Sequence, residues 1–109
     1  MIDWVRLIGA VIAIESGGDP RAYNVKEDAI GILQVRPCVV EDLRRYYGAD
    51  ITHEMMTKET AARWAFIHYG RMWGARTAEE FARIWNGGPR GATKQSTLEY
   101  WNRVRNLYN

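Results

Sequence analysis

A run of mostly apolar residues near the start of the chain predicts its first helix. The apolar side chains from Trp4 onward recur at helical spacing, and Gly17 is a stop signal. Asp3 is a suitable N-cap, so we expect a helix from residue 4 to about residue 16. On a helical wheel Glu15 lies within about 60° of every member of an apolar stripe. This stripe consists of Trp4, Ile8, Val11 and Ile12.

The rest of the chain predicts five further helical segments and one irregular stretch. Residues 17–36 are rich in Gly, Asp, Asn and Pro before they turn apolar, which favours a loop with a short strand or hairpin. Pro37 and Gly48 mark the two ends of a helix, and Gly74 closes a longer one. The fold class is therefore mainly α, with about six helices and a minor β element near residues 17–36. The helices after the first are expected over residues 37–47, 52–56, 58–73, 77–86 and 96–107.

Two capping boxes and two apolar faces refine this picture. Thr77 to Glu80 and Ser96 to Glu99 both follow the pattern Ser/Thr-x-x-Glu, which places helix starts there. The buried face of the helix over residues 58–73 is expected to consist of Ala61, Trp64, Ala65, His68 and Met72. That of the last helix is expected to consist of Tyr100, Trp101, Val104 and Leu107.

The composition is that of an ordinary folded protein. The 109 residues are 47% hydrophobic and 26% charged, which suits one domain over residues 1–109 with its own core. The net charge of +2 is uneven: residues 1–54 carry six Lys or Arg against nine Asp or Glu, and residues 55–109 carry nine against four. The basic residues stand singly apart from Arg44-Arg45, unlike the stripes of nucleic-acid binders. We expect a monomer with no nucleic-acid partner.

Cysteine, histidine and the start of the chain exclude several other classes. Cys38 has no second cysteine to pair with and is interpreted as a small buried residue. His53 and His68 lack Cys or acidic company, so no metal and no cofactor are expected. No basic leader precedes the first apolar run and Arg6 interrupts it, so the pattern fits neither a signal peptide nor a membrane span. An extracellular destination would then be reached by lysis, by packaging into a particle, or through a signal outside this sequence.

Glu15 combines two features that raise the pKa of a carboxyl group. Its predicted position on the apolar face disfavours the charged form, and the macrodipole at a helix C-terminus does the same. A carboxylic acid that stays protonated near neutral pH is what general acid catalysis requires. The alternative is a buried glutamate satisfied by arginine or backbone donors.

Three short motifs give this glutamate a context. They are Glu15-Ser16-Gly17 after an apolar helix, Gly31-Ile32-Leu33-Gln34, and Trp85-Asn86-Gly87-Gly88-Pro89. In this order they resemble the motifs of soluble lytic transglycosylases, which read Glu-Ser, Gly-Leu-Met-Gln and Ala-Tyr-Asn-Ala-Gly. The resemblance covers about residues 4–104 and implies the lysozyme-like fold that this family shares with goose-type lysozymes.

The resemblance also implies an activity on the bacterial cell wall. Such enzymes cleave the β-1,4 bond between N-acetylmuramic acid and N-acetylglucosamine in peptidoglycan strands and leave a 1,6-anhydro sugar. Glu15 matches the family's catalytic glutamate, which acts first as acid and then as base. A compact chain of this kind would suit a phage lysis or tail enzyme, or a domain of a larger protein. The residues expected to bind substrate are Ser16, Tyr23, Gly31, Gln34, Trp85, Asn86 and Tyr100.

Departures from the family pattern leave alternatives open. Leu33 replaces a Met and Trp85 a Tyr, and acidic Glu27-Asp28 is expected near a groove between the first helix, the 17–36 loop and the Asn86 turn. A second carboxylate among Glu27, Asp28 and Asp19 would instead make the chain a hydrolytic muramidase. A non-catalytic glycan-binding module is a further alternative.

Three of the expected site residues also have structural interpretations. Gln34 and Asn86 could serve only to satisfy loop backbone. Tyr100 lies on the core side of its predicted helix, so core packing is as good an explanation as substrate contact.

Overall fold

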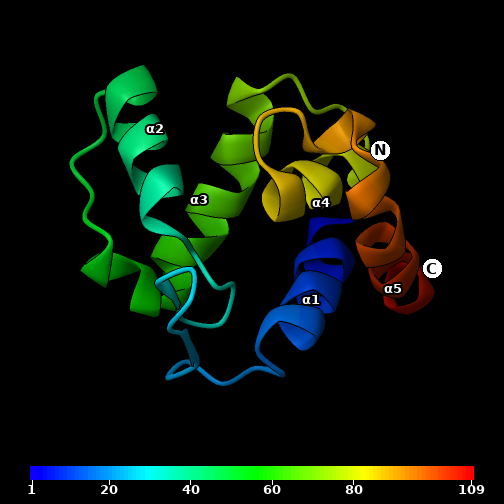
Figure 1. Ribbon diagram of the computed structural model, residues 1–109, viewed down its shortest axis with the longest axis horizontal. Helices are drawn as coiled ribbons and strands as arrows, with labels where there is room; N and C mark the ends of the chain where they lie inside the picture. The colour runs from blue at the N-terminus through cyan, green and yellow to red at the C-terminus, as the bar shows by residue number, and fades with distance from the viewer.

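The computed structural model describes all residues 1–109 and is mainly helical, as the sequence predicts. Figure 1 shows α3 between α2 on one side and α1, α4 and α5 on the other. Five segments form α-helices, and the expected helix over residues 52–56 is a single 3-10 turn. The α-helices are α1 Trp4–Glu15, α2 Pro37–Tyr47, α3 Glu59–Met72, α4 Ala78–Gly87 and α5 Leu98–Tyr108. The 3-10 turns are η1 Glu54–Thr57, η2 Gly91–Thr93 and η3 Gln95–Thr97.

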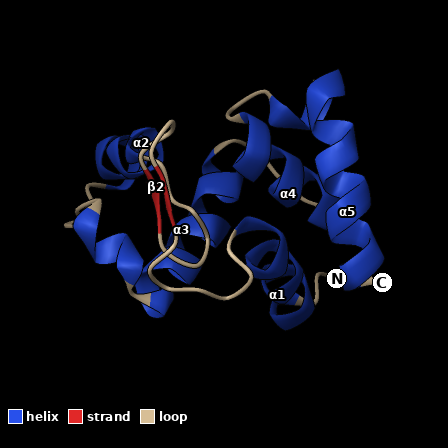
Figure 2. Cartoon of the chain, turned by 60° about the horizontal axis from the view of Figure 1, so that its bottom comes forward, coloured by secondary structure: helices blue, strands red, loops and turns tan.

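A short antiparallel hairpin follows α1. Its strands are β1 Tyr23–Asn24 and β2 Ala29–Ile30, with Tyr23 opposite Ile30. Figure 2 shows that it lies on the α2 side of the molecule, away from α5. The apolar run that follows Ala29 does not continue as a strand, because the backbone turns at Gly31 and Gln34, whose φ angles are +81° and +53°.

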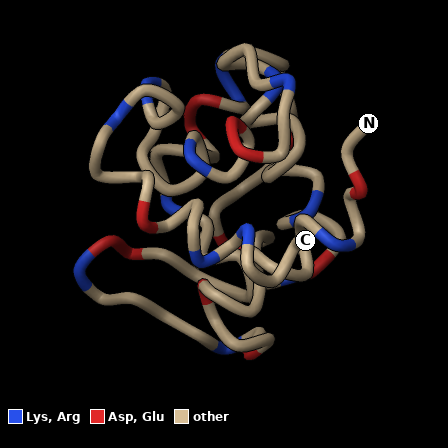
Figure 3. Tube along the Cα trace, turned by 90° about the vertical axis from the view of Figure 1, so that its right-hand side faces the viewer, with Lys and Arg blue, Asp and Glu red and all other residues tan.

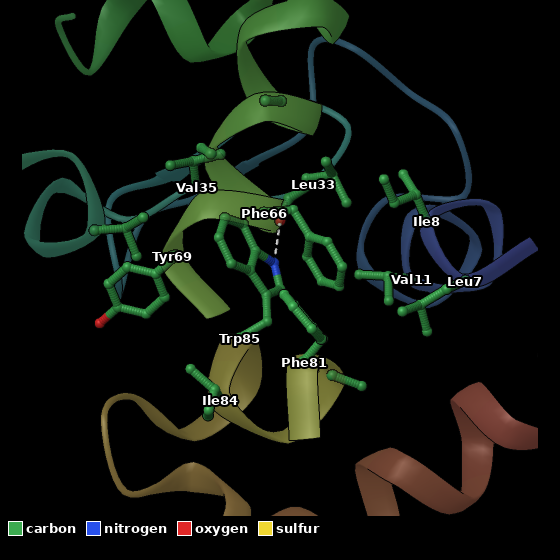
Figure 4. Close-up of a cluster of buried hydrophobic side chains, with 14 of the residues drawn as sticks. Leu7, Ile8, Val11, Leu33, Val35, Phe66, Tyr69, Phe81, Ile84 and Trp85 are labelled. Atoms are coloured by element: carbon green, nitrogen blue, oxygen red, sulfur yellow. Dashed lines mark hydrogen bonds between the residues drawn. The ribbon is translucent and has the colours of Figure 1, made fainter. Parts of the chain in front are cut away.

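One hydrophobic core of 21 buried residues joins the helices. The apolar face of α1 contributes to it as the sequence predicts, through Ile8 and Val11. Trp85 of α4 lies within this core, with its ring edge-on to Phe66 and Tyr69 of α3 (Figure 4). The core therefore fixes the end of α4 against α3 and the loop after the hairpin.

The buried face of α3 is displaced by about one position from the expected one. Of the predicted set only Ala65 is fully buried, whereas Trp64 and His68 are half-buried and stack on each other with ring centroids 4.5 Å apart. The helix is packed on two sides, against α2 and against α4, so its aromatic residues divide between them. The fully buried residues of α3 are Ala62, Ala65, Phe66, Tyr69 and Gly70.

Two of the three predicted helix caps are present in the structure, and the third is not. Asp3 caps α1, since its carboxylate accepts a hydrogen bond of 3.2 Å from the backbone N–H of Arg6. The capping box of Thr77 and Glu80 is present at α4. The second predicted box is wrong, because Ser96 lies within η3 and the residue that precedes α5 is Thr97. Thr97 makes no cap hydrogen bond, since its buried hydroxyl accepts from Arg83 and donates to the Gly91 carbonyl.

Two residues expected in the interior lie at the surface. Cys38 is exposed, because it is the second residue of α2 and lies outside the buried face that Val39, Val40 and Leu43 form. Leu107 is 55% exposed near the end of α5. The acidic and basic positions are interspersed along the whole trace (Figure 3). None of the helices has the length and apolar character needed to span a membrane.

Candidate active site

Glu15 is the last residue of α1 and is half-buried. Burial raises the pKa of its carboxyl group above the ordinary value of 4.5. A hydrogen bond from Tyr100 and the charges of Arg36 and Arg103 oppose that rise in pKa, and the charge of Glu27 adds to it. Because burial is the largest of these effects, the protonated form of Glu15 is favoured relative to a free glutamate.

Tyr100 reaches Glu15 from the opposite end of the sequence. Its hydroxyl donates a hydrogen bond of 2.8 Å to Oε2 of Glu15, and only 8% of its surface is exposed. Burial and the neighbouring carboxylate raise the pKa of Tyr100 well above 10, so the phenol stays neutral and can donate. Tyr100 therefore packs in the core, as one of its two interpretations predicts, and its hydroxyl binds the carboxylate of Glu15.

Ser16 joins the end of α1 to the loop after the hairpin. Its hydroxyl donates to the Ile32 carbonyl at 2.7 Å and accepts from the backbone N–H of Gly18 at 3.1 Å. The motif residue next to the glutamate thus holds the second motif beside it.

Gly31 and Gln34 shape that second motif. A Cβ on Gly31 would lie 2.6 Å from the Met56 carbonyl oxygen, so only glycine fits there at its positive φ. The side-chain amide of Gln34 donates to the carbonyls of Ala22 and Gly31, both at 3.0 Å. Both amide hydrogens are used to close the loop, and Oε1 of Gln34 accepts no hydrogen bond from the chain.

The third motif is attached to the same loop through Trp85. The indole N–H donates to the Leu33 carbonyl at 2.9 Å, as the dashed line in Figure 4 marks. Only 4% of Trp85 is exposed, so this ring is a core residue that positions the loop. Asn86, the next residue, is exposed at the end of α4.

Arg36 is a functional candidate that the sequence pattern did not reveal. Its guanidinium donates a hydrogen bond of 2.8 Å to the Trp85 carbonyl, and its charge lowers the pKa of Glu15. The residue is half-buried at the N-cap of α2. The only available signal was its place between the Gln34 motif and Pro37, which does not distinguish it from a surface arginine.

The hairpin places the acidic pair and Tyr23 at the surface. Tyr23 is 54% exposed and its hydroxyl donates to the Asp28 carboxylate at 3.0 Å. Hydrogen bonding to Asp28 raises the pKa of Tyr23. Glu27, rather than Asp28, is the acidic residue of the hairpin whose charge acts on Glu15.

The segments around Glu15 are joined as expected, but none of the surface hollows lies at Glu15. Hydrogen bonds bring together the end of α1, the loop after the hairpin and the end of α4, as predicted. The three hollows of the surface lie elsewhere, and Glu15 lines none of them. No three His, Cys, Asp or Glu side chains converge on a common point. His53 instead bonds to the Val35 carbonyl at 2.7 Å.

The arrangement of five helices and one small hairpin is that of the lysozyme-like fold. The sequence matches the transglycosylase SLT domain over residues 2–66, more than half of its length. The chain belongs to this family, as the resemblance predicts; the match includes the first two motifs and ends before the third.

Comparison with known proteins extends the match to lysozymes of bivalve molluscs. The chain is 46% identical to the lysozyme of Ostrea edulis over 39 residues, which are 36% of this chain and 28% of that protein. It is 30% identical to lysozyme 1 of Crassostrea virginica over 97 residues, 84% of this chain and 53% of that protein. The chain thus spans about half or less of the length of these relatives.

A solved structure shows the same fold. It is a chain of the crystal structure of Aeromonas hydrophila PliI in complex with Meretrix lusoria lysozyme. The two chains superpose with a TM-score of 0.75 at 26% identity, over 94% of this chain and 88% of that one.

Proposed function

We propose that this chain degrades peptidoglycan by lytic transglycosylation at the bacterial cell wall, with Glu15 as its catalytic residue. The bond cleaved is the β-1,4 linkage between N-acetylmuramic acid and N-acetylglucosamine. The observation that carries the proposal is the half-buried carboxyl of Glu15, whose pKa burial raises and whose Oε2 accepts a hydrogen bond from Tyr100. Membership in the SLT family and likeness to lysozymes support it.

In the first step Glu15 donates its proton to the glycosidic oxygen, and the bond from that oxygen to C1 of the muramyl sugar breaks. In the second, the Glu15 carboxylate takes the proton of the C6 hydroxyl as O6 bonds to C1. The product is a 1,6-anhydro sugar, and no water is consumed. Tyr100 and Arg36 stabilise the carboxylate between the two steps, because one donates a hydrogen bond to it and the other lies near it as a positive charge.

The remaining candidates divide into contact and positioning residues. Asn86 and the ring of Tyr23 are exposed and can contact the sugar, and Gln34 has Oε1 available. Ser16, Gly31 and Trp85 act on the substrate indirectly, because their polar groups or close contacts hold the loop next to Glu15.

Arg36 is a positioning residue in this proposal. Its hydrogen bond to Trp85 fixes the carbonyl that directly precedes Asn86, across a sequence separation of 49 residues. The same guanidinium moderates the pKa of Glu15. One side chain thus couples the geometry of the substrate-binding turn to the proton affinity of the catalytic acid.

A hydrolytic muramidase is the second candidate, and one observation favours it. Glu27 is an exposed carboxylate whose charge acts on Glu15, so it is the residue that could activate a water on the opposite face of the sugar. Hydrolysis would release a reducing muramyl end in place of the anhydro end.

Mass spectrometry of the muropeptides released from purified peptidoglycan separates the two reactions. Transglycosylation predicts anhydro products that borohydride cannot reduce and that are lighter by one water than the hydrolytic products. Reducible ends carrying the extra water would establish the muramidase reaction. Absence of any released product would contradict both.

A further inference from the structure

The largest hollow on the surface lies along α2, and Glu15 is not among its lining residues. Its volume is about 540 Å³, which is within the range of ligand pockets. The lining positions on α2 follow helical spacing, so they form one face of the helix, and His53 before η1 closes the other side. The lining residues are Pro37, Val40, Glu41, Arg44, Arg45 and His53.

The charges of this hollow favour an anionic ligand. Arg44 and Arg45 occupy the last turn of α2. Arg45 is paired with Glu41, whereas Arg44 has no hydrogen-bond or ion-pair partner for its side chain. A guanidinium group suits a carboxylate because it can donate two parallel hydrogen bonds to it.

His53 adds a second kind of contact. Its Nε2 lies 2.7 Å from the Val35 carbonyl oxygen, which can only accept, so Nε2 carries the hydrogen. In the neutral ring Nδ1 is then an acceptor for an N–H group. A ligand that offers both carboxylates and amide N–H groups is a short acidic peptide.

One end of the hollow, at Pro37, adjoins Arg36 of the candidate active site. Pro37 directly follows Arg36, which is bound to the end of α4. From Pro37 to Arg45 the helix rises by about 12 Å. An extended peptide of four residues spans about 13–14 Å, so a peptide that starts near Arg36 reaches the two arginines.

We propose that this hollow binds the stem peptide of peptidoglycan, with Arg44 holding one of its carboxylates. The proposal rests on the proposed function for the identity of the peptide. It makes the α2 face a second contact of the enzyme with its substrate, in addition to the glycan strand at Glu15.

The test compares two substrates and two variants of the full chain. The substrates are glycan strands with stem peptides and the same strands after an amidase has removed them. Arg44→Gln should raise KM for peptide-bearing strands at least about fivefold, with kcat unchanged, and leave KM for stripped strands unchanged. Arg105→Gln is the matched control, since Arg105 is an exposed last-turn arginine of α5, and it should change neither value. An equal change on both substrates, or none, would overturn the proposal.

A direct binding measurement separates this proposal from the proposed function. If wild type cleaves neither substrate, the enzymatic proposal fails, and calorimetric titration with a free stem tetrapeptide decides on the hollow. Binding that Arg44→Gln weakens would support the peptide site. Equal binding to both proteins, or no binding, would overturn it. Binding of inorganic polyphosphate together with no affinity for the peptide would also overturn it, and would assign the hollow to a phosphate ligand.

Discussion

At the scale of the residue, Glu15 is defined by opposing influences on one carboxyl group. Burial raises its pKa, while the Tyr100 hydroxyl and the Arg36 charge lower it. The sequence predicted the burial, because the apolar stripe of a helix is local information. Tyr100 was expected at the site only from the family resemblance, and Arg36 was not expected at all, because both contacts depend on how distant segments pack.

The first prediction concerns the pH dependence of stability. Because the pKa of Glu15 is raised above 4.5 in the folded chain, the folded state binds more protons than the unfolded state at pH values between the unfolded-state and the folded-state pKa. The Glu15 contribution to stability therefore falls as pH rises through its folded-state pKa. Glu15→Gln lacks this loss, so its free energy of unfolding relative to wild type should grow from pH 4 upward and then level off. Urea unfolding at several pH values measures it; a constant difference would contradict the raised pKa.

The second prediction concerns Arg36. Removing its charge removes an influence that lowers the pKa of Glu15, so the form active as an acid should persist to higher pH. The alkaline limb of kcat/KM should move to higher pH in Arg36→Met and stay near the wild-type position in Arg36→Lys. Both variants disturb the hydrogen bond to the Trp85 carbonyl. If Arg36 acted only through that bond, both variants would lose activity and the alkaline limb would move in neither, which would contradict the prediction.

At the scale of the element, the boundaries set by local chemistry were predictable and those set by packing were not. Pro37 begins α2 and Gly48 ends it in a left-handed conformation, as the sequence indicates. The Ser96–Glu99 pattern looks the same as the Thr77–Glu80 pattern, yet Ser96 lies in η3 and α5 begins after Thr97, whose buried hydroxyl accepts a hydrogen bond from Arg83. A motif of four residues contains no information about an arginine 14 positions away.

The third prediction uses this pair of motifs as its own control. Thr77→Ala should cost about 1 kcal/mol of unfolding free energy, because a hydroxyl that caps the Glu80 N–H is lost. Ser96→Ala should change it by less than about 0.5 kcal/mol, because Ser96 is exposed and caps no helix. Urea midpoints at an unchanged m-value report both. Similar losses in the two variants would mean that Ser96 does cap α5.

At the scale of the whole molecule, three segments far apart in sequence surround Glu15. Ser16 reaches the Ile32 carbonyl, and Trp85 and Arg36 connect α4 to the loop and to α2. The order of the motifs was enough to predict this convergence, because the family resemblance supplies the fold. The resemblance did not supply the basic hollow on α2, which is outside all three motifs.

The fourth prediction maps the substrate onto this arrangement. A chitin-type oligosaccharide without peptides should slow hydrogen exchange at the backbone amides around Ser16, Gln34 and Asn86. The reason is that the sugar would cover the three segments that meet at Glu15. Protection confined to Arg44-Arg45 and α5 would place the glycan elsewhere and remove the basis for the site.

The central claim is that a single carboxyl group does the acid and base chemistry, and turnover of purified peptidoglycan by three variants tests it most directly. Glu15→Gln keeps the shape but cannot donate a proton to the glycosidic oxygen, so kcat should fall by about 10²–10⁴-fold. Glu27→Gln and Asp28→Asn should each slow the reaction by less than about tenfold, which is under 1.4 kcal/mol. Activity of Glu15→Gln within a few-fold of wild type, or a loss of 10²-fold or more in either hairpin variant, would contradict the claim.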